Sequence, residues 1–356
     1  MPPGPPTRFS SESGPVLAIV CPGQGSQTPG FLSPWLELPG VGDQLAWLSA
    51  VAGLDLQVHG TTSDADTIRD TAVAQPLIVA AGLVTAAALF EGGSGSGTGA
   101  GSGGGSEASG GGLGALPAGT AGVLAGHSVG EFTAAALAGV LSPEQAMVLV
   151  RERGRAMAAA SAVTPTGMSA VLGGVPAEVA EVLAAHGLTA ANANGAGQVV
   201  AAGTLEQLAA LAAAPPGRAR VIPLQVAGAF HTRHMAPAVQ VLARLAGGVR
   251  PGVPSTTLLS NADGAEVAGG PDALQRLVTQ VSNPVRWDSC MEAMRALGVT
   301  AVLELTPAGT LTGLAKRALP GVQLVALKSP DDLDAARALL ADSAPLVTVV
   351  PSGVTA

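Results

Sequence analysis

Short, continuous apolar runs alternate along the chain with longer segments whose apolar residues recur every three or four positions. Runs such as 16–21 and 123–126 are typical of strands buried on both faces of a parallel sheet, whereas the longer segments are typical of helices with one buried face. Towards the carboxyl end the alternation predicts strands at 257–260, 301–305 and 322–327 and helices at 271–281, 288–297, 310–319 and 331–341. The pattern therefore predicts an α/β core with a mostly parallel sheet.

The middle of the chain has a different order of shorter elements. Strands are predicted at 168–173, 188–194, 198–202 and 220–226, with helices at 176–186 and 205–214. This β-α-β-β-α-β order is the ferredoxin-like arrangement. We therefore expect a small inserted subdomain at 164–228 and a core built from 16–163 and 229–342. Residues 1–15 and 343–356 are expected to be loose ends, and the Gly- and Ser-rich stretch 91–114 a flexible loop.

Composition and charge narrow the possible partners. The formal net charge of −8 argues against nucleic acid, which requires a basic face. We see no apolar leader, and the longest apolar stretch, 77–90, is shorter than the ~20 residues of a membrane span and follows Pro76, which suits the first turn of a buried helix. Cys21 and Cys290 lie far apart in apolar surroundings, as reduced thiols do. We expect a cytoplasmic protein that binds neither nucleic acid nor a membrane.

A candidate nucleophile lies where the apolar run 123–126 ends. Gly-His-Ser-Val-Gly extends from Gly126 to Gly130, and an alanine-rich helical pattern follows. A strand, a sharp turn carrying serine and a helix form a nucleophile elbow, in which the first helical N–H groups point at the hydroxyl. Glycine on both sides allows a close backbone approach that a Cβ would obstruct. The pentapeptide also arises by chance in a chain with 49 glycines, but its strand-and-helix context favours Ser128 as a nucleophile.

Histidine is the usual base for such a serine because its pKa lies near neutrality, and the chain contains five. His231 is the best placed, since it follows the apolar and glycine residues that lead out of the small subdomain. His234 lies close by, but no third ligand with suitable spacing accompanies the pair, so we expect no metal site. The other histidines have simpler assignments: a polar loop for His59, a helix end for His186 and a side chain turned away from the serine for His127.

The acidic residues argue against an ordinary hydrolase triad. α/β-Hydrolases follow the serine with Asp or Glu and then His in chain order. No aspartate lies between Asp70 and Asp263, and the glutamates between Ser128 and His231 are assigned to helix faces. We therefore favour a dyad of Ser128 and His231, with the imidazole oriented by a backbone carbonyl or a neutral side chain.

Two further features have open interpretations. A helix is predicted from Ser142 as N-cap to about residue 160, and Arg153 falls on its apolar flank. An arginine is seldom buried without an anionic partner, so Arg153 stands out on this flank. A purely structural role, as half of a buried ion pair or as a snorkelling stem, fits equally well. The glycine-rich segment 22–27 contains no phosphate-binding signature. Gln24 and Gln27 offer donors at the carboxyl end of the first strand, where parallel sheets form their ligand crevice, but a plain turn is an equal alternative.

Five segments in order share one resemblance. They are 22–27 (Pro-Gly-Gln-Gly-Ser-Gln), 126–131 (Gly-His-Ser-Val-Gly-Glu), 153–154 (Arg-Gly), 229–231 (Ala-Phe-His) and 280–285 (Gln-Val-Ser-Asn-Pro-Val). Together they resemble the motifs of the malonyl-CoA:acyl carrier protein transacylases and the related acyltransferase domains of polyketide synthases. The resemblance implies an α/β-hydrolase-like core with a ferredoxin-like insertion. It also implies that Ser128 becomes malonylated and that His231 is the base, oriented by the backbone carbonyl of Gln280.

The same resemblance implies roles around the acyl group. Gln24 and the N–H of Val129 correspond to the family's oxyanion hole, and Arg153 corresponds to its malonate clamp. The planar fork of a guanidinium suits a carboxylate, which accounts for an arginine on an inward stripe. Phe230 resembles the malonyl-selecting form of the family, because its ring would crowd the 2-methyl group of methylmalonyl.

The implied partners are malonyl-CoA, which is a substrate, and an acyl carrier protein; no permanently bound cofactor is expected. Because carrier proteins and this chain are both acidic, the docking rim must be locally basic. Arg220, Lys316 and Arg317 match basic positions of the family, although solvated helix ends explain them equally well. The alternatives are the acyltransferase subunit of a malonate decarboxylase, a serine esterase and a non-catalytic binding module. The missing aspartate and the inward Arg153 disfavour the esterase, whereas the motifs do not separate the decarboxylase subunit.

Overall fold

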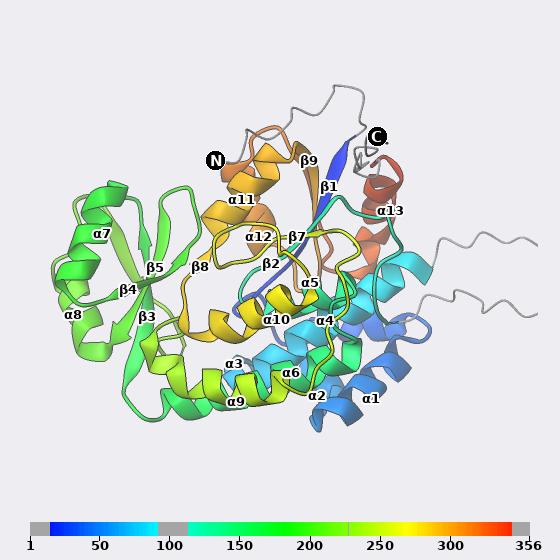
Figure 1. The fold of residues 1–356 in the computed structure, drawn as a ribbon, viewed down its shortest axis with the longest axis horizontal. Helices are drawn as coiled ribbons and strands as arrows, with labels where there is room; N and C mark the ends of the chain where they lie inside the picture. Colours follow the sequence, from blue (N-terminus) through cyan, green and yellow to red (C-terminus); the bar gives the residue numbers. More distant parts are fainter. Residues whose placement is uncertain (1–14, 92–112, 227, 344–356) are drawn as a thin grey trace, which may run out of the picture.

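The computed structural model describes residues 15–91, 113–226 and 228–343. These residues form two five-stranded sheets flanked by helices, with the smaller unit at the left of Figure 1. The segments expected to be loose, 1–15, 91–114 and 343–356, lie outside the described residues except at their inner edges.

The first sheet, sheet A, is parallel throughout. Its strands in spatial order are β10 (Gln323–Ala326), β9 (Val299–Glu304), β1 (Val16–Cys21), β2 (Val123–Gly126) and β7 (Thr257–Leu258). Because β1 and β2 are neighbours, the loops that leave their carboxyl ends meet, and the N–H of His127 donates to the carbonyl of Cys21 at 2.9 Å. A Cβ on Gly130 would lie 2.1 Å from that carbonyl oxygen, which explains the glycine.

Helices cover both faces of sheet A, as the alternating pattern predicts. Alternate residues of β1 belong to different apolar cores, Leu17 and Ile19 to one and Ala18 and Val20 to the other. The first core includes α1 (Val41–Ala52), α4 (Thr71–Glu91), α5 (Gly130–Leu137), α6 (Pro143–Ser161) and α13 (Leu333–Ala341), and the second includes α11 (Trp287–Ala296) and α12 (Thr310–Ala318). The predicted α/β core with a mostly parallel sheet is therefore confirmed.

The apolar helix α4 lies inside the larger core. By length and composition alone, the window Thr71–Phe90 would suffice to cross a membrane, but 89% of it is buried within the protein. The expected buried helix is therefore correct, but its start is not, because Pro76 lies inside the helix. A proline there frees the carbonyl one turn earlier, and Nη1 of Arg151 donates to the Ala72 oxygen at 2.9 Å. The extra turn is thus stabilised by a side chain from α6.

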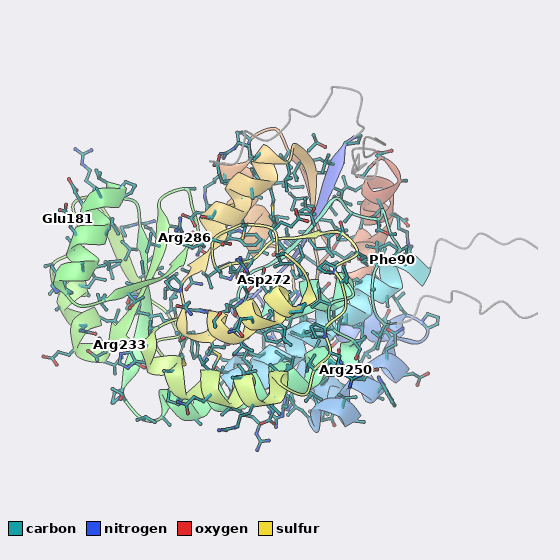
Figure 2. The ribbon with its side chains drawn as sticks, in the orientation of Figure 1. Phe90, Glu181, Arg233, Arg250, Asp272 and Arg286 are labelled. Carbon is teal, nitrogen blue, oxygen red and sulfur yellow. The ribbon has the colours of Figure 1, made fainter. Side chains whose placement is uncertain are left out.

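The second sheet, sheet B, contains the elements predicted for the middle of the chain. Its strands in spatial order are β6 (Arg220–Pro223), β3 (Thr166–Leu172), β5 (Gln198–Thr204), β4 (Thr189–Ala193) and β8 (Val285–Arg286), and its helices are α7 (Pro176–Ala185) and α8 (Leu205–Ala213). The first four strands pair antiparallel. The fifth was not predicted: β8 comes from much later in the chain and pairs parallel with β4. Arg286 of β8, labelled in Figure 2, lies at this junction.

The remaining differences concern short elements. The sequence reasoning assigned nothing to α1, α2 (Leu56–Thr61), α3 (Ala65–Arg69) and the 3₁₀ turn η1 (Ser33–Glu37). His59, expected in a loop, lies in α2 and hydrogen-bonds Ser63. The later helices lie close to their predicted positions: α9 (Ala236–Ala246), α10 (Gly270–Thr279), α11, α12 and α13. Asp55 and Asp64 cap α2 and α3 through their side chains, so these short helices depend on local polar signals more than on apolar periodicity.

Candidate active site

Ser128 lies in a strained turn between β2 and α5. Its φ is 52°, in the left-handed region that non-glycine residues seldom adopt. The turn is held by Asn261, whose Oδ1 accepts from the Ser128 N–H at 2.7 Å and whose Nδ2 donates to the Gly126 carbonyl at 2.7 Å. A Cβ on Gly126 would lie 2.1 Å from the carbonyl carbon of Gly130, so the first glycine allows the strand and helix to meet.

The side chains of Ser128 and His231 are in direct contact. Oγ of Ser128 lies 2.7 Å from Nε2 of His231, and Nδ1 of His231 lies 2.9 Å from the backbone oxygen of Gln280. A carbonyl only accepts, so Nδ1 carries the proton and Nε2 is free to accept from the hydroxyl. The structure therefore brings together the three groups expected to form the dyad and its support.

His231 is kept neutral by its surroundings. Burial lowers its pKa to about 3, and the nearby charge of Arg153 acts in the same direction. An uncharged imidazole can take a proton from a hydroxyl at any pH near neutrality. His127, in contrast, turns away from Ser128 and hydrogen-bonds Oδ1 of Asn194 at 2.9 Å.

Arg153 is buried beside the nucleophile. Only 1% of it is exposed, and its Nη2 lies 3.4 Å from Oγ of Ser128. Besides this hydroxyl, its hydrogen-bond partners are two amide oxygens, Oε1 of Gln75 at 2.6 Å and Oε1 of Gln280 at 2.7 Å. Within the described parts of the chain no carboxylate forms a direct salt bridge with it, and its burial excludes a snorkelling stem. Burial lowers its pKa to about 10, which leaves the guanidinium charged at neutral pH.

One cavity of about 600 Å³ connects the groups expected around the acyl chain. Its lining includes Gln24, Ser128, Val129, Arg153, Phe230 and His231. The side-chain amide of Gln24 is already engaged, because Nε2 donates to the Arg69 carbonyl at 3.1 Å, so the candidate oxyanion donor of this residue is its backbone N–H. Val129 is the N-cap of α5, where backbone N–H groups lack intrahelical partners.

The expected docking residues lie outside this cavity, near one of its edges. Lys316 and Arg317 are in the last turn of α12, and Nη2 of Arg317 lies 3.3 Å from Oε1 of Gln198, which lines the cavity. The register of sheet B aligns Arg220 with Leu172 and Leu172 with Gln198. Arg220 is therefore two strands, about 10 Å, from Gln198 at the same end of the sheet.

Sequence reasoning missed two buried side chains that support the site. Glu131 is 5% exposed and accepts from the N–H of Asn261 at 2.7 Å and from Nε2 of Gln280. Burial raises its pKa to about 7. The amide of Gln280 was also missed, because only its backbone carbonyl was considered. A carboxylate in the otherwise uncharged, fully buried helix α5 is the signal that points to Glu131.

Known proteins are similar to this chain in fold and in sequence. A family model described as acyl transferase domain matches residues 114–340. The chain is 49% identical over 319 residues to the malonyl CoA-acyl carrier protein transacylase of Mycobacterium tuberculosis (strain ATCC 25618 / H37Rv), which spans 90% of this chain and 98% of the relative. The crystal structure of MCAT from Mycobacterium tuberculosis matches with a TM-score of 0.80 at 47% identity, over 90% of this chain and 99% of that one.

A third match includes a carrier protein. It is a type II PKS acyl-carrier protein in complex with its malonyl-transacylase, and it aligns with a TM-score of 0.77 at 29% identity over 91% of this chain and 99% of that one. Family model, sequence and fold agree along most of the chain. This chain belongs to the acyl transferase family, among the malonyl CoA-acyl carrier protein transacylases.

Proposed function

We propose that this protein transfers a malonyl group from coenzyme A to the thiol of an acyl carrier protein through a malonyl-Ser128 intermediate. One observation carries the proposal: the Ser128–His231 pair and the buried guanidinium of Arg153 lie on the same cavity, with Nη2 of Arg153 3.4 Å from the nucleophilic oxygen. A nucleophile beside a fixed cation fits an acyl group that carries its own carboxylate.

The first half-reaction forms the acyl-enzyme. Nε2 of His231 takes the proton of Ser128 as Oγ attacks the thioester carbonyl, and the tetrahedral oxygen accepts from the backbone N–H groups of Gln24 and Val129. Each such donor contributes roughly 3–4 kcal/mol to the transition state. The C–S bond then breaks, and the imidazolium returns its proton to the departing coenzyme A sulfur.

The second half-reaction reverses these roles. The thiol of the carrier's phosphopantetheine gives its proton to His231 and attacks the malonyl ester, and Ser128 leaves with a proton from the imidazolium. Arg153 holds the free carboxylate of the malonyl group in both steps, and Phe230 restricts the space at C2. No step requires a bound cofactor.

The architecture fits this assignment. The β-α-β-β-α-β order and antiparallel pairing of 164–228 support a ferredoxin-like subdomain, inserted into an α/β-hydrolase-like core formed by 16–163 and 229–342. We place the docking rim for the carrier at Arg220, Lys316 and Arg317, which flank the cavity edge. Two buried free thiols, Cys21 and Cys290, support a cytoplasmic location.

Intact-mass measurement after incubation with malonyl-, methylmalonyl- and acetyl-CoA tests the function directly. We expect one malonyl adduct on the wild-type protein, none on Ser128→Ala, and its loss when an acyl carrier protein with its phosphopantetheine arm is added. An adduct that persists on Ser128→Ala would overturn the mechanism. Release of free malonate faster than transfer to the carrier would instead favour an esterase.

A further inference from the structure

Gln280 touches each part of the proposed site. Its backbone oxygen accepts from Nδ1 of His231 at 2.9 Å, and its side-chain Oε1 accepts from Nη2 of Arg153 at 2.7 Å. Its Nε2 donates to the backbone carbonyl of Ser128 at 2.8 Å. One residue thus contacts the base, the guanidinium and the nucleophile, and the direction of its amide decides whether Arg153 meets an acceptor or a donor.

Glu131 and the Ser128 carbonyl together set the direction of that amide, because both accept from its NH₂ group. Its Oε2 accepts from Nε2 of Gln280, while its Oε1 accepts from the N–H of Asn261 at 2.7 Å. In its ionised form, which prevails above pH of about 7, the Glu131 carboxylate can only accept, so it binds the NH₂ end of the amide and leaves the carbonyl end for Arg153. In a flipped amide the NH₂ group would face the guanidinium, donor against donor.

The burial of Glu131 needs an explanation, because a buried carboxylate is costly unless its charge is compensated. Among the described residues no Lys or Arg forms a direct salt bridge with it. Its electrostatic partner is Arg153, which lies on the other side of the Gln280 amide. The three side chains form a hydrogen-bonded chain from the Glu131 carboxylate through the Gln280 amide to the Arg153 guanidinium.

We propose that Glu131 is a positioning residue for acyl selectivity: through the Gln280 amide it orients the Arg153 guanidinium towards the carboxylate of the acyl group. The proposal rests on the proposed function, in which Arg153 binds that carboxylate. Glu131 itself touches neither the acyl group nor the reacting atoms. It also supplies a countercharge that keeps the buried guanidinium stable while the cavity is empty.

The test measures selectivity in three variants, Glu131→Gln, Gln280→Met and the double variant. Each is mixed with equal amounts of malonyl-CoA and acetyl-CoA, and the rates of malonyl- and acetyl-Ser128 formation are read by intact mass. We expect Glu131→Gln to lower the malonyl-to-acetyl rate ratio about tenfold, a size typical of residues in one hydrogen-bond network. Gln280→Met should act similarly, and the double variant should be no worse than Gln280→Met, since Glu131 acts through that amide.

Glu304→Gln is the matched control. Glu304 is also buried, but it accepts from the backbone N–H groups of Gly309, Leu311 and Thr312 at the start of α12, and among the described residues no hydrogen bond joins it to Arg153 or Gln280. It should alter thermal stability without altering the rate ratio.

The outcomes separate the two levels of the argument. Failure of the wild-type protein to form malonyl-Ser128 would overturn the proposed function. Normal malonylation of the wild type with an unchanged ratio in folded Glu131→Gln would overturn the positioning role alone. Multiplied effects in the double variant would also overturn it, because they require an independent action of Glu131. Should Glu131→Gln not fold, an unchanged ratio in Gln280→Met has the same force.

Discussion

The two halves of the cavity are held in place by different means. In the reactive half, Ser128 and His231 both have positive φ, 52° and 60°; the side chain of Asn261 holds the Ser128 backbone, and the backbone carbonyl of Gln280 holds the His231 ring. In the clamp half, Arg153, Gln280 and Glu131 lie in the helical segments α6, η3 (Gln280–Ser282) and α5 and are joined by side-chain hydrogen bonds. Strained backbone therefore positions the chemistry, and a side-chain network positions the charge.

This difference predicts that rate and selectivity are separable. Strain of roughly 1–3 kcal/mol at each reactive residue is the same for every acyl group, because it belongs to the backbone. The clamp, in contrast, distinguishes acyl groups by charge. Changes in the reactive half should slow malonyl and acetyl loading alike, and changes in the clamp half should alter their ratio.

The largest effect should come from His231→Ala. Loss of the base should slow formation of acyl-Ser128 by about 10³-fold for malonyl-CoA and acetyl-CoA alike. Time-resolved intact mass with each thioester measures both rates. A much larger loss for malonyl-CoA than for acetyl-CoA would place His231 in the clamp half and break the comparison.

Arg153→Ala should have the opposite character. Malonyl loading should fall about 100-fold, because a buried charge pair loses one partner, while acetyl loading holds or rises. Competition between the two thioesters measures the change. An equal loss for both would make Arg153 structural. Thermal unfolding of the same variant provides the control, since Gln75 and Gln280 lose a donor and the free energy of unfolding should fall by about 1–3 kcal/mol.

Phe230 tests selectivity by shape instead of charge. It is 7% exposed and lines the cavity next to the base. Phe230→Ser should raise methylmalonyl loading relative to malonyl about tenfold, a typical discrimination for one methyl group in an apolar pocket. If the methylmalonyl-to-malonyl ratio stays constant while both loading rates fall, the Phe230 ring supports His231 and does not select between the acyl groups.

The docking rim should give a smaller effect. Reversing charge at Arg220, Lys316 and Arg317 together should lower kcat/KM for the acyl carrier protein about three- to tenfold, and added salt should reduce the difference. Transfer to free pantetheine, measured alongside, should fall less. Equal losses with both acceptors would show that these residues act on the cavity and not on the carrier.

The smallest change is expected in the pH profile of acetyl loading. Burial and the charges of Arg153 and His127 lower the pKa of His231 to about 3, so the imidazole stays neutral and the rate should be nearly flat on mild acidification. An acid limb near the ordinary histidine pKa would contradict this.

The malonyl-to-acetyl ratio should instead fall below pH of about 7, where the raised pKa of Glu131 lets that carboxylate take up a proton.

Local patterns indicated which residues belong to the reactive half. A continuous apolar run ending in Gly-x-Ser-x-Gly predicts where Ser128 lies, and the lack of aspartate up to Asp263 favours a neutral support for His231. The first signal is read within a few residues, and the second needs only the order of residue types along the chain. The capped helix α6, with Ser142 and Gln145 forming a capping box, was equally visible and placed Arg153 on an inward stripe.

The clamp half was largely invisible because its contacts join distant segments. Glu131 and Gln280 are separated by 149 positions, and no periodicity links them. The strand β8 was missed for a related reason: two residues, Val285 and Arg286, are too short for a pattern and pair with β4 from another part of the chain. Only the folded chain shows that the segment 280–286 serves both the site and the second sheet.

The pairing of β8 with β4 limits how the subdomain 164–228 can be exchanged between related proteins. Residues 164–228 look self-contained along the chain, yet their sheet is completed by Val285 and Arg286. Val285 is also fully buried in the apolar core that sheet A shares with α11 and α12. A chimaera cut at 164 and 228 would meet a foreign edge strand, and the mismatch would fall a few residues from Gln280. A chimaera should therefore take the segment 280–286 from the same parent protein as residues 164–228, so that the second sheet keeps its own fifth strand.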